Sequence, residues 1–166
     1  MKRWYAVHCK PGQDERAEQH LRHQRYEVFR PLARLRRRLR GQMRAVIESL
    51  FPRYLFVRLD DHAENWAPIR STRGVRDLVR FAGGCPGPVP NVVIESLCDQ
   101  TDPETGCVEL ARNTDFQPDQ PVTIMEGPFA GREALFVSRR GEERVMVLLD
   151  VMQQAQRVEL PESALS

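Results

Sequence analysis

The chain has 166 residues, of which 41% are hydrophobic and 29% are charged, and its formal net charge at pH 7 is +2. This length fits one medium domain, or a domain of about 100 residues followed by a module of about 50. No apolar run approaches the roughly 20 residues that span a bilayer, and the start, "MKRWYAVHCKPGQDE", becomes charged before a signal-peptide core could form. We therefore expect a cytoplasmic protein without a membrane segment.

The charge is distributed unevenly along the chain. Residues 1–100 carry 19 Lys and Arg against 11 Asp and Glu, whereas residues 101–166 carry 6 against 12. A basic half predicts an anionic partner, and the acidic half can also attract the basic one.

Cysteines and histidines give no pattern of a metal or catalytic site. The four cysteines are spaced irregularly, so we expect reduced thiols and no metal or cofactor. No G-x-S-x-G or Walker motif occurs, and an enzyme is not expected. His20 and His23, one helical turn apart, leave a small ribonuclease open as one alternative.

The first 100 residues alternate between strand and helix patterns, which predicts an α+β domain. Pro11 and Gly12 end the first strand, and Asp14 is expected to cap the first helix. Pro68 is expected to break the second helix. Strands are predicted over 4–9, 26–33, 43–50, 53–60 and 75–81, and helices over 14–25, 62–71 and 91–100.

The stretch "SLFPRYLFVRLD" at 49–60 raises a question about what covers its aromatic side chains. Read as a strand, it places Leu55, Val57 and Leu59 on one face. Tyr54 and Phe56 point to the other face. An aliphatic row is what a sheet buries against helices, so the two aromatic rings require a cover of their own.

Residues 34–44, "RLRRRLRGQMR", form what we call the arginine arm, which contains six arginines and no acidic residue. Two predicted strands flank Gly41, so a hairpin with Gly41 at its tip is expected. Such a run binds nucleic-acid phosphates in a salt-dependent way. A hairpin tip that merely stays soluble is the open alternative.

The first predicted helix carries donors on one side. At about 100° per residue they fall within a stripe roughly 100° wide, which suits phosphates and base edges. A solvated helix face is the alternative. We call this group the polar stripe: Gln13, Arg16, His20, His23 and Gln24. Lys10 and the segment "STRG" at 71–74 add donors that can converge on it.

The carboxy-terminal part of the chain fits two templates. Residues 101–115 have few large apolar side chains and read as a linker, and short strands separated by Gly and Pro after it indicate a small β-barrel. Helical and strand periods nevertheless both fit one segment. The helical set is Val145, Leu148, Leu149 and Met152, and the alternating set is Val145, Val147, Leu149 and Val151.

Four stretches resemble the NusG family of bacterial transcription elongation factors, in the right order and over almost the whole chain. They are "WYAVHCKPGQ", "LFPRYLFVRLD", "STRGVRDLVRFAG" and "VTIMEGPFAGREALF". Within the family, the chain is most similar to the specialised RfaH-type paralogues.

The resemblance implies three segments. An α+β domain with an antiparallel sheet flanked by helices would occupy residues 1–100, a linker 101–115, and a KOW-type domain 116–166. The KOW-type domain would be a β-barrel or, in a closed autoinhibited state, an α-helical hairpin that covers the first domain. A general KOW motif has glycine where this chain has Ala134, a replacement that RfaH-type proteins share and that a helix tolerates.

The resemblance also implies partners and site residues. A monomer would contact the β′ clamp helices of RNA polymerase through an aromatic patch: His8, Tyr54, Phe56, Phe81 and Leu97. It would contact the non-template DNA strand through Lys10, Gln13, Arg16, His20, His23, Gln24, Thr72 and Arg73. Glu48 and Arg144 match an interdomain ion pair of the closed state. The released module would contact the ribosome through a small-subunit ribosomal protein.

The chain departs from the family pattern in two places. His23 stands where arginine is expected, which concerns the DNA sequence preference. Asn65, Trp66 and Ala67 stand where a His-Thr-Thr element would contact the polymerase β subunit.

The expected function is a non-enzymatic elongation and antitermination factor that suppresses pausing and termination. The open alternatives are a general NusG-like factor and an RNA-binding or ribosome-binding KOW protein.

Overall fold

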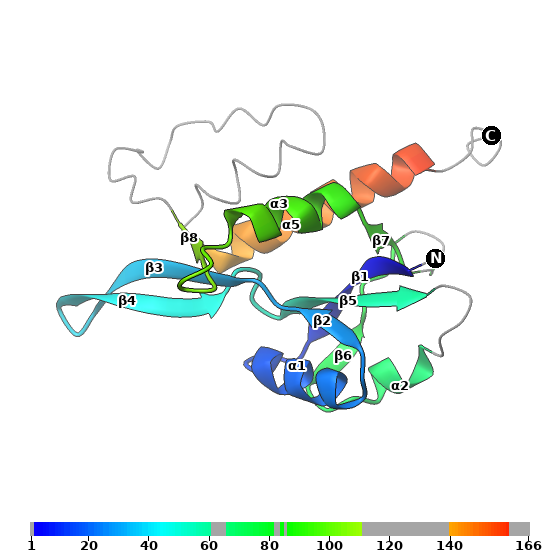
Figure 1. Cartoon of the computed structure of the whole chain (residues 1–166), viewed down its shortest axis with the longest axis horizontal. Helices are drawn as coiled ribbons and strands as arrows, with labels where there is room; N and C mark the ends of the chain where they lie inside the picture. Colours follow the sequence, from blue (N-terminus) through cyan, green and yellow to red (C-terminus); the bar gives the residue numbers. More distant parts are fainter. Residues whose placement is uncertain (1, 61–65, 82–83, 85, 111–139, 160–166) are drawn as a thin grey trace.

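The computed structural model describes residues 2–60, 66–81, 84, 86–110 and 140–159, and the side chains of the last segment up to Gln153 (Figure 1). Within these residues, no helix is long and apolar enough to cross a bilayer.

An antiparallel sheet of five strands forms the centre of the fold. Its strands follow each other in the order β2, β5, β1 and β6, and β7 also pairs with β1. Alternating side chains give this sheet two buried faces, and each face has its own hydrophobic cluster. The strands are β1 (Lys2–Cys9), β2 (Glu27–Phe29), β5 (Tyr54–Asp60), β6 (Val75–Leu78) and β7 (Pro88–Val89).

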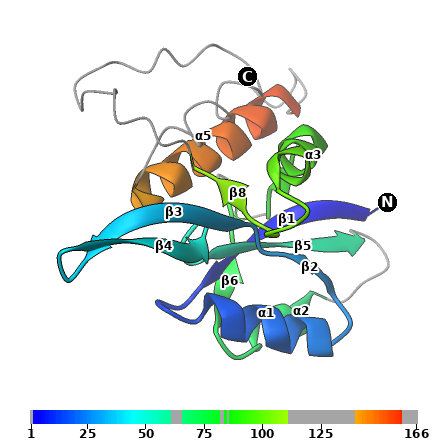
Figure 2. The same cartoon turned by 60° about the vertical axis from the view of Figure 1, so that its left-hand side comes forward.

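Helices α1 (Asp14–His23) and α2 (Ala67–Arg70) cover the aliphatic face of the sheet (Figure 2). Their fully buried side chains, Ala17, Leu21 and Ile69, belong to the cluster that contains the aliphatic row of β5. The expected burial of that row is confirmed.

Helices α3 (Asn91–Gln100) and α5 (Gly141–Glu159) lie on the opposite face, where Figure 1 shows them side by side. Their buried residues Leu97, Leu148 and Met152 share one cluster with Phe51 and Phe56 of the sheet side. The aromatic rings of β5 are therefore covered by two helices of their own chain, one of which comes from the carboxy-terminal part.

A second sheet carries the arginine arm. In it, β3 (Leu32–Leu39) pairs with β4 (Gln42–Ser49) in antiparallel register and with β8 (Val108–Glu109) in parallel. Arg40 and Gly41 form the turn with φ angles of 51° and 77°, as a two-residue hairpin turn requires. The predicted hairpin and its tip at Gly41 are confirmed, and Figures 1 and 2 both show it projecting from the body.

Several element ends differ from the sequence prediction. The strand expected over 26–33 is divided into β2 and β3, because Pro31 has no N–H to donate; its carbonyl instead accepts from the Leu50 N–H at 2.9 Å. Asp14 is not the cap of α1. Gln13 holds that position, and Asp14 Oδ2 accepts from the Arg53 N–H at 2.8 Å. Pro68 lies in the first turn of α2, where proline is tolerated.

The segment expected to be a linker begins with ordered structure. Cys107, Val108 and Leu110 are buried, and the pairing of β8 with β3 holds this stretch on the first domain. Three hydrogen bonds of Asp102 fix the turn before it: the Asp102 N–H donates to the Cys107 carbonyl, and Asp102 accepts from the Gly106 and Glu104 N–H groups. Residues 111–115 lie outside the described part of the chain.

Residues 141–159 adopt the helical template. The most buried side chains of α5 are Arg144, Leu148 and Met152, four residues apart each time, so they share one face of the helix. The β-barrel predicted as one alternative over 116–166 is not the state of residues 141–159, which are helical. Residues 116–139, which include the first part of the predicted hairpin, lie outside the described residues.

Gly74 allows the turn after α2 to dock on α1. Its φ is +88°, and a Cβ at this position would lie 3.0 Å from the backbone N of Ala17 and 3.0 Å from the backbone O of Gln13. Gly12 has a similar φ of +70° but no atom within 4 Å of such a Cβ. Substituting Gly12 therefore tests the cost of backbone strain alone, whereas substituting Gly74 adds the cost of the close contact with α1.

We expect Gly12→Ala to lower the free energy of unfolding by about 1 kcal/mol through backbone strain alone. Gly74→Ala should lower it by about 3 kcal/mol, because the backbone of α1 must also move. Urea unfolding followed by circular dichroism measures both values. Equal losses in the two variants would contradict the close approach.

Candidate functional site

The aromatic patch begins with a stacked pair on neighbouring strands. The register of β1 and β5 places His8 opposite Tyr54, and their ring centroids lie 4.7 Å apart with an interplanar angle of 10°. Burial lowers the pKa of His8, and the nearby charges of Arg53 and Arg76 lower it further. A neutral imidazole on a phenol ring is an apolar surface with polar edges, which suits a protein partner.

Two residues of the predicted patch are core residues in this structure. Phe56 is fully buried and contacts Phe29 and Phe51 at centroid distances of 6.2 and 5.9 Å. Leu97 on α3 is also buried. The rings at the accessible edge are Tyr54 and Phe81, which are half-buried beside this cluster.

Helix α5 closes over this edge and leaves a cleft of about 410 Å³ between itself and the sheet. His8, Tyr54 and Phe81 line it from the sheet side, and Leu149 and Gln153 line it from α5. The predicted patch is thus divided between a buried core and a cleft beneath the helix.

Arg144 fixes the first turn of α5 to the first domain. Its side chain is fully buried, and its Nε donates to the Leu50 carbonyl at 2.6 Å. Its Nη2 lies 3.0 Å from Glu48 Oε1. Burial lowers the pKa of Arg144, whereas the hydrogen bond and charge of Glu48 raise it. The structure therefore brings together the two residues that the resemblance assigned to an interdomain pair.

Two further contacts mark the same end of α5. A Cβ on Gly141 would overlap Pro52 Cγ, so the start of the helix approaches the β4–β5 turn too closely for a side chain. Glu48 Oε1 also accepts from Arg37 Nη2 at 2.9 Å. The ion pair to Arg144 has its acid in the basic half of the chain and its base in the acidic half, so the overall charge difference does not explain it.

The polar stripe lies along α1, beside the turn that follows α2. Arg16 and His23 are exposed, and Gln13 and His20 are half-buried. Lys10 is exposed, and its backbone N–H donates to the Gly74 carbonyl at 2.8 Å. Arg73 is exposed within that turn. The two segments named from the sequence therefore meet on one surface.

Thr72 has a different position from its neighbours. It is buried, its Oγ1 donates to the Pro68 carbonyl at 2.8 Å, and it accepts from Gln24 Nε2 at 2.8 Å. Its side chain thus orients Gln24. The exposed donors on either side remain available for a ligand.

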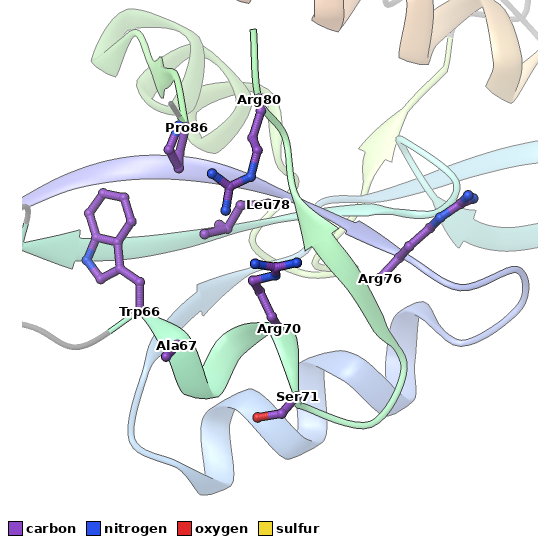
Figure 3. Close-up of a pocket in the computed structure, with 8 residues that line it drawn as sticks. All are labelled: Trp66, Ala67, Arg70, Ser71, Arg76, Leu78, Arg80 and Pro86. Carbon is purple, nitrogen blue, oxygen red and sulfur yellow. The ribbon is translucent and has the colours of Figure 1, made fainter. Parts of the chain in front are cut away.

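A cleft of about 590 Å³, which was not predicted from the sequence, lies between α2 and the chain around β6. Figure 3 shows the side chains of Arg70 and Arg80 extending toward each other, with Trp66 and Pro86 on one side of them, while Arg76 points away. Asp77 lies 3.4 Å from Arg70 and 3.6 Å from Arg80, so it partly neutralises the pair. The only sequence signal was the spacing of arginines around β6.

No disulfide joins the cysteines in the described part of the chain. Cys9, Cys98 and Cys107 are free, and burial raises the pKa of Cys9 to about 12. Cys85 lies outside the described residues. In the described ranges, no group of three or more His, Cys, Asp or Glu could hold a metal ion.

The family described as "Transcription termination factor nusG" matches residues 2–98, which contain the sheet, the polar stripe and the aromatic patch. The chain belongs to the NusG family. Proteins named "Transcription termination/antitermination protein NusG" from Staphylococcus aureus strains Mu50 and N315 are each 27% identical to it over 140 residues, which cover 79% of this chain and 76% of theirs.

Among solved structures, one described as "Domain interaction in Thermotoga maritima NusG" is similar to this chain with a TM-score of 0.42 and 24% identity. That similarity covers 58% of this chain and 55% of the other.

Loss of the carboxylate at Glu48 should free α5 without unfolding the first domain. We expect Glu48→Gln to lower the stability of the docked helix by about 2 kcal/mol, since a buried guanidinium loses its charged acceptor. Amide hydrogen exchange of 144–153 should then be roughly 30-fold faster by mass spectrometry.

Glu109→Gln is the matched control, because Glu109 pairs with Arg34 at an exposed site. Its α5 amides should exchange at the unchanged rate. Equal exchange rates of the α5 amides in the unmodified chain and in both variants would show that the ion pair between Glu48 and Arg144 does not hold the helix.

Proposed function

We propose that this NusG family member is a transcription elongation and antitermination factor of the RfaH type, with RNA polymerase as its protein partner. The single observation that carries the proposal is the seating of α5 on the aromatic patch, with Arg144 fully buried beneath it. A helix that hides an apolar surface behind one anchored ion pair is suited to reversible release.

The polymerase surface would comprise the exposed edge of the aromatic patch once α5 leaves. Departure of α5 removes Leu148 and Met152 from the cluster, which exposes apolar side chains that a partner helix pair can cover. Phe56 and Leu97 would not contact the polymerase directly, because both are buried, Phe56 on the sheet and Leu97 on α3. They would instead support the contact surface from beneath.

The non-template strand of DNA is the proposed ligand of the polar stripe, together with Lys10 and Arg73. Exposed arginine, lysine and histidine side chains on two adjoining segments can contact phosphates and base edges of a single strand. Thr72 and Gln24 would set the shape of this surface through their 2.8 Å hydrogen bond.

The proposal divides the chain into a polymerase-binding and DNA-binding domain over 1–100, a connection over 101–115, and a KOW-type domain over 116–166 that changes fold on release. The helical α5, in a segment that also fits an alternating strand pattern, supports such a change. The released barrel would contact the ribosome through a small-subunit ribosomal protein. Trp66 matches the position of the element that contacts the polymerase β subunit in RfaH-type proteins, so the cleft that it lines would adjoin that subunit.

A general NusG-like factor is the second candidate, favoured by the names of the Staphylococcus aureus relatives. A general factor would join transcription complexes at most genes. The RfaH-type factor would join them only at particular DNA sequences, and mapping its positions on transcribed genes separates the two.

Polymerase binding can be tested at Tyr54. We expect Tyr54→Ala in a Glu48→Gln background to weaken binding to purified core RNA polymerase at least tenfold, because the exposed edge loses its stacked ring pair. Phe56→Ala is unsuitable, since truncating a fully buried Phe costs about 3–5 kcal/mol of stability.

Tyr26→Ala in the same background is the matched control, because Tyr26 packs against the opposite cluster of the sheet. It should bind polymerase normally in a pull-down or by interferometry. Full binding by the Tyr54 variant would remove the proposed docking surface.

Single-strand binding can be tested on two arginines of α1. Arg16→Gln should weaken binding to a non-template-strand oligonucleotide about five- to tenfold, because one phosphate contact is lost. Arg22→Gln should not, since Arg22 pairs with Glu18 at 3.2 Å outside the polar stripe. Fluorescence anisotropy measures both, and equal affinities would refute the stripe as the DNA site.

A further inference from the structure

The arginine arm has a pattern that the proposed function does not use. Register places Arg34, Arg36 and Arg38 of β3 directly across from Ile47, Ala45 and Met43 of β4. Because paired residues share a face, one side of the ribbon carries a row of cations beside a row of apolar side chains.

The other face of the ribbon is also cationic. Arg37 and Arg44 are paired across the strands there, and Leu39 lies at the tip of the same face. Arg40 occupies the turn itself. The free part of the arm therefore presents guanidinium groups in both directions, and no carboxylate occurs between residues 34 and 44.

These charges are mostly uncommitted within the described residues. Arg36, Arg38 and Arg40 make no ion pair to another described side chain, and all three are exposed. Arg44 Nη2 donates to Gln42 Oε1 at 3.4 Å and makes no ion pair with another described side chain. Leu39, Met43 and Ile47 are 47%, 55% and 57% exposed, and they make up three of the four large hydrophobic side chains that the described part of the chain exposes.

The base of the arm is fixed, so the ribbon is held in one orientation. Ala33 and Leu35 are buried, β8 pairs with β3 at Ala33 and Arg34, and Arg37 is tied to Glu48 at 2.9 Å. Beyond Leu35, four residues of each strand extend freely, a reach of about 13 Å at 3.3 Å per residue.

We propose that the arginine arm enters the major groove of double-stranded DNA. Guanidinium groups on both faces require a ligand with negative charge on both sides, whereas a flat acidic protein surface would meet only one face. The major groove of B-form DNA admits a two-stranded ribbon between two phosphate backbones, at about 12 Å wide and 8.5 Å deep. The apolar tip residues Leu39 and Met43 then reach the groove floor, where thymine presents a methyl group.

Other nucleic acids fit this shape less well. The major groove of duplex RNA is too deep and narrow for side chains to read, and a single strand offers one backbone instead of two. The inference does not depend on the proposed single-strand site, because the arm and the polar stripe share no residue.

The test uses the full chain and measures fluorescence anisotropy with a 20-bp DNA duplex, its isolated strand and the RNA duplex of the same sequence. Arg36→Gln changes one face of the ribbon and Arg44→Gln changes the other. Arg58→Gln is the control, because Arg58 is an exposed arginine on β5 that lies off the arm.

We expect each arm variant to reduce the slope of log affinity against log salt by about 0.9 on duplex DNA. When the salt concentration rises from 50 to 200 mM, each arm variant should therefore lose duplex affinity by a factor about 3.5-fold smaller than the factor lost by the unmodified chain. Met43→Ala should lower duplex affinity by a constant factor at every salt concentration, since it removes no charge. The control should match the unmodified chain on all three ligands.

Three outcomes would overturn the proposal. First, if only one of Arg36→Gln and Arg44→Gln changes duplex binding, the arm docks on a flat surface through one face. Second, if the arm variants weaken binding to the duplex and to the single strand equally, the contact does not depend on the shape of the groove. Third, if the arm variants bind duplex DNA normally but bind purified polymerase more weakly, the arm belongs to a protein interface. Failure of Arg16→Gln to affect the single strand would refute the polar stripe and leave this test intact.

Discussion

The position of helix α5 on the first domain depends on one buried guanidinium. Arg144 is fully buried, and a buried charge without partners is unfavourable by several kcal/mol. The Glu48 carboxylate, near the end of β4, and the Leu50 carbonyl, in the turn that follows, supply those partners. Helix α5 can therefore dock only where that turn presents them, and Leu148 and Met152 follow at one and two helical turns along the same face.

The docking of α5 at this position determines which side chains of the sheet are exposed to solvent. The aliphatic face is covered by α1 and α2, whereas the aromatic face is covered by α3 and by a helix from a distant part of the chain. Buried charge pairs contribute little net stability compared with apolar contacts, but breaking one is costly. An anchor of this kind therefore defines the position of a cover more strongly than it increases the stability of the fold.

Local patterns predicted most elements of the first domain, because alternation and helical spacing report burial on one face. Gly41 marked the hairpin tip, and the order of strands and helices was recognisable. The features that were not predicted depend on contacts between residues far apart in the sequence. Asp14 has the sequence of a cap but bonds to Arg53, and "CVEL" at 107–110 lacks a pattern although β3 supplies its partner. Likewise, Arg70 and Arg80 meet only because α2 turns back onto β6. The helical state of 141–159 was one of two templates, and only tertiary contacts distinguish them.

Glu48 connects the two parts of the molecule that the sequence treats as separate. One of its oxygen atoms lies 2.9 Å from Arg37 and 3.0 Å from Arg144, so the base of the arginine arm and the anchor of α5 share an acceptor. The arm does not depend on that acceptor for its orientation, since the strand pairing with β8 and the burial of Ala33 and Leu35 hold it independently. Helix α5 has no such backbone pairing among the described residues. Release of the shared carboxylate would therefore loosen the cover before it loosens the arm, which lets the aromatic face open while the cationic ribbon stays in place.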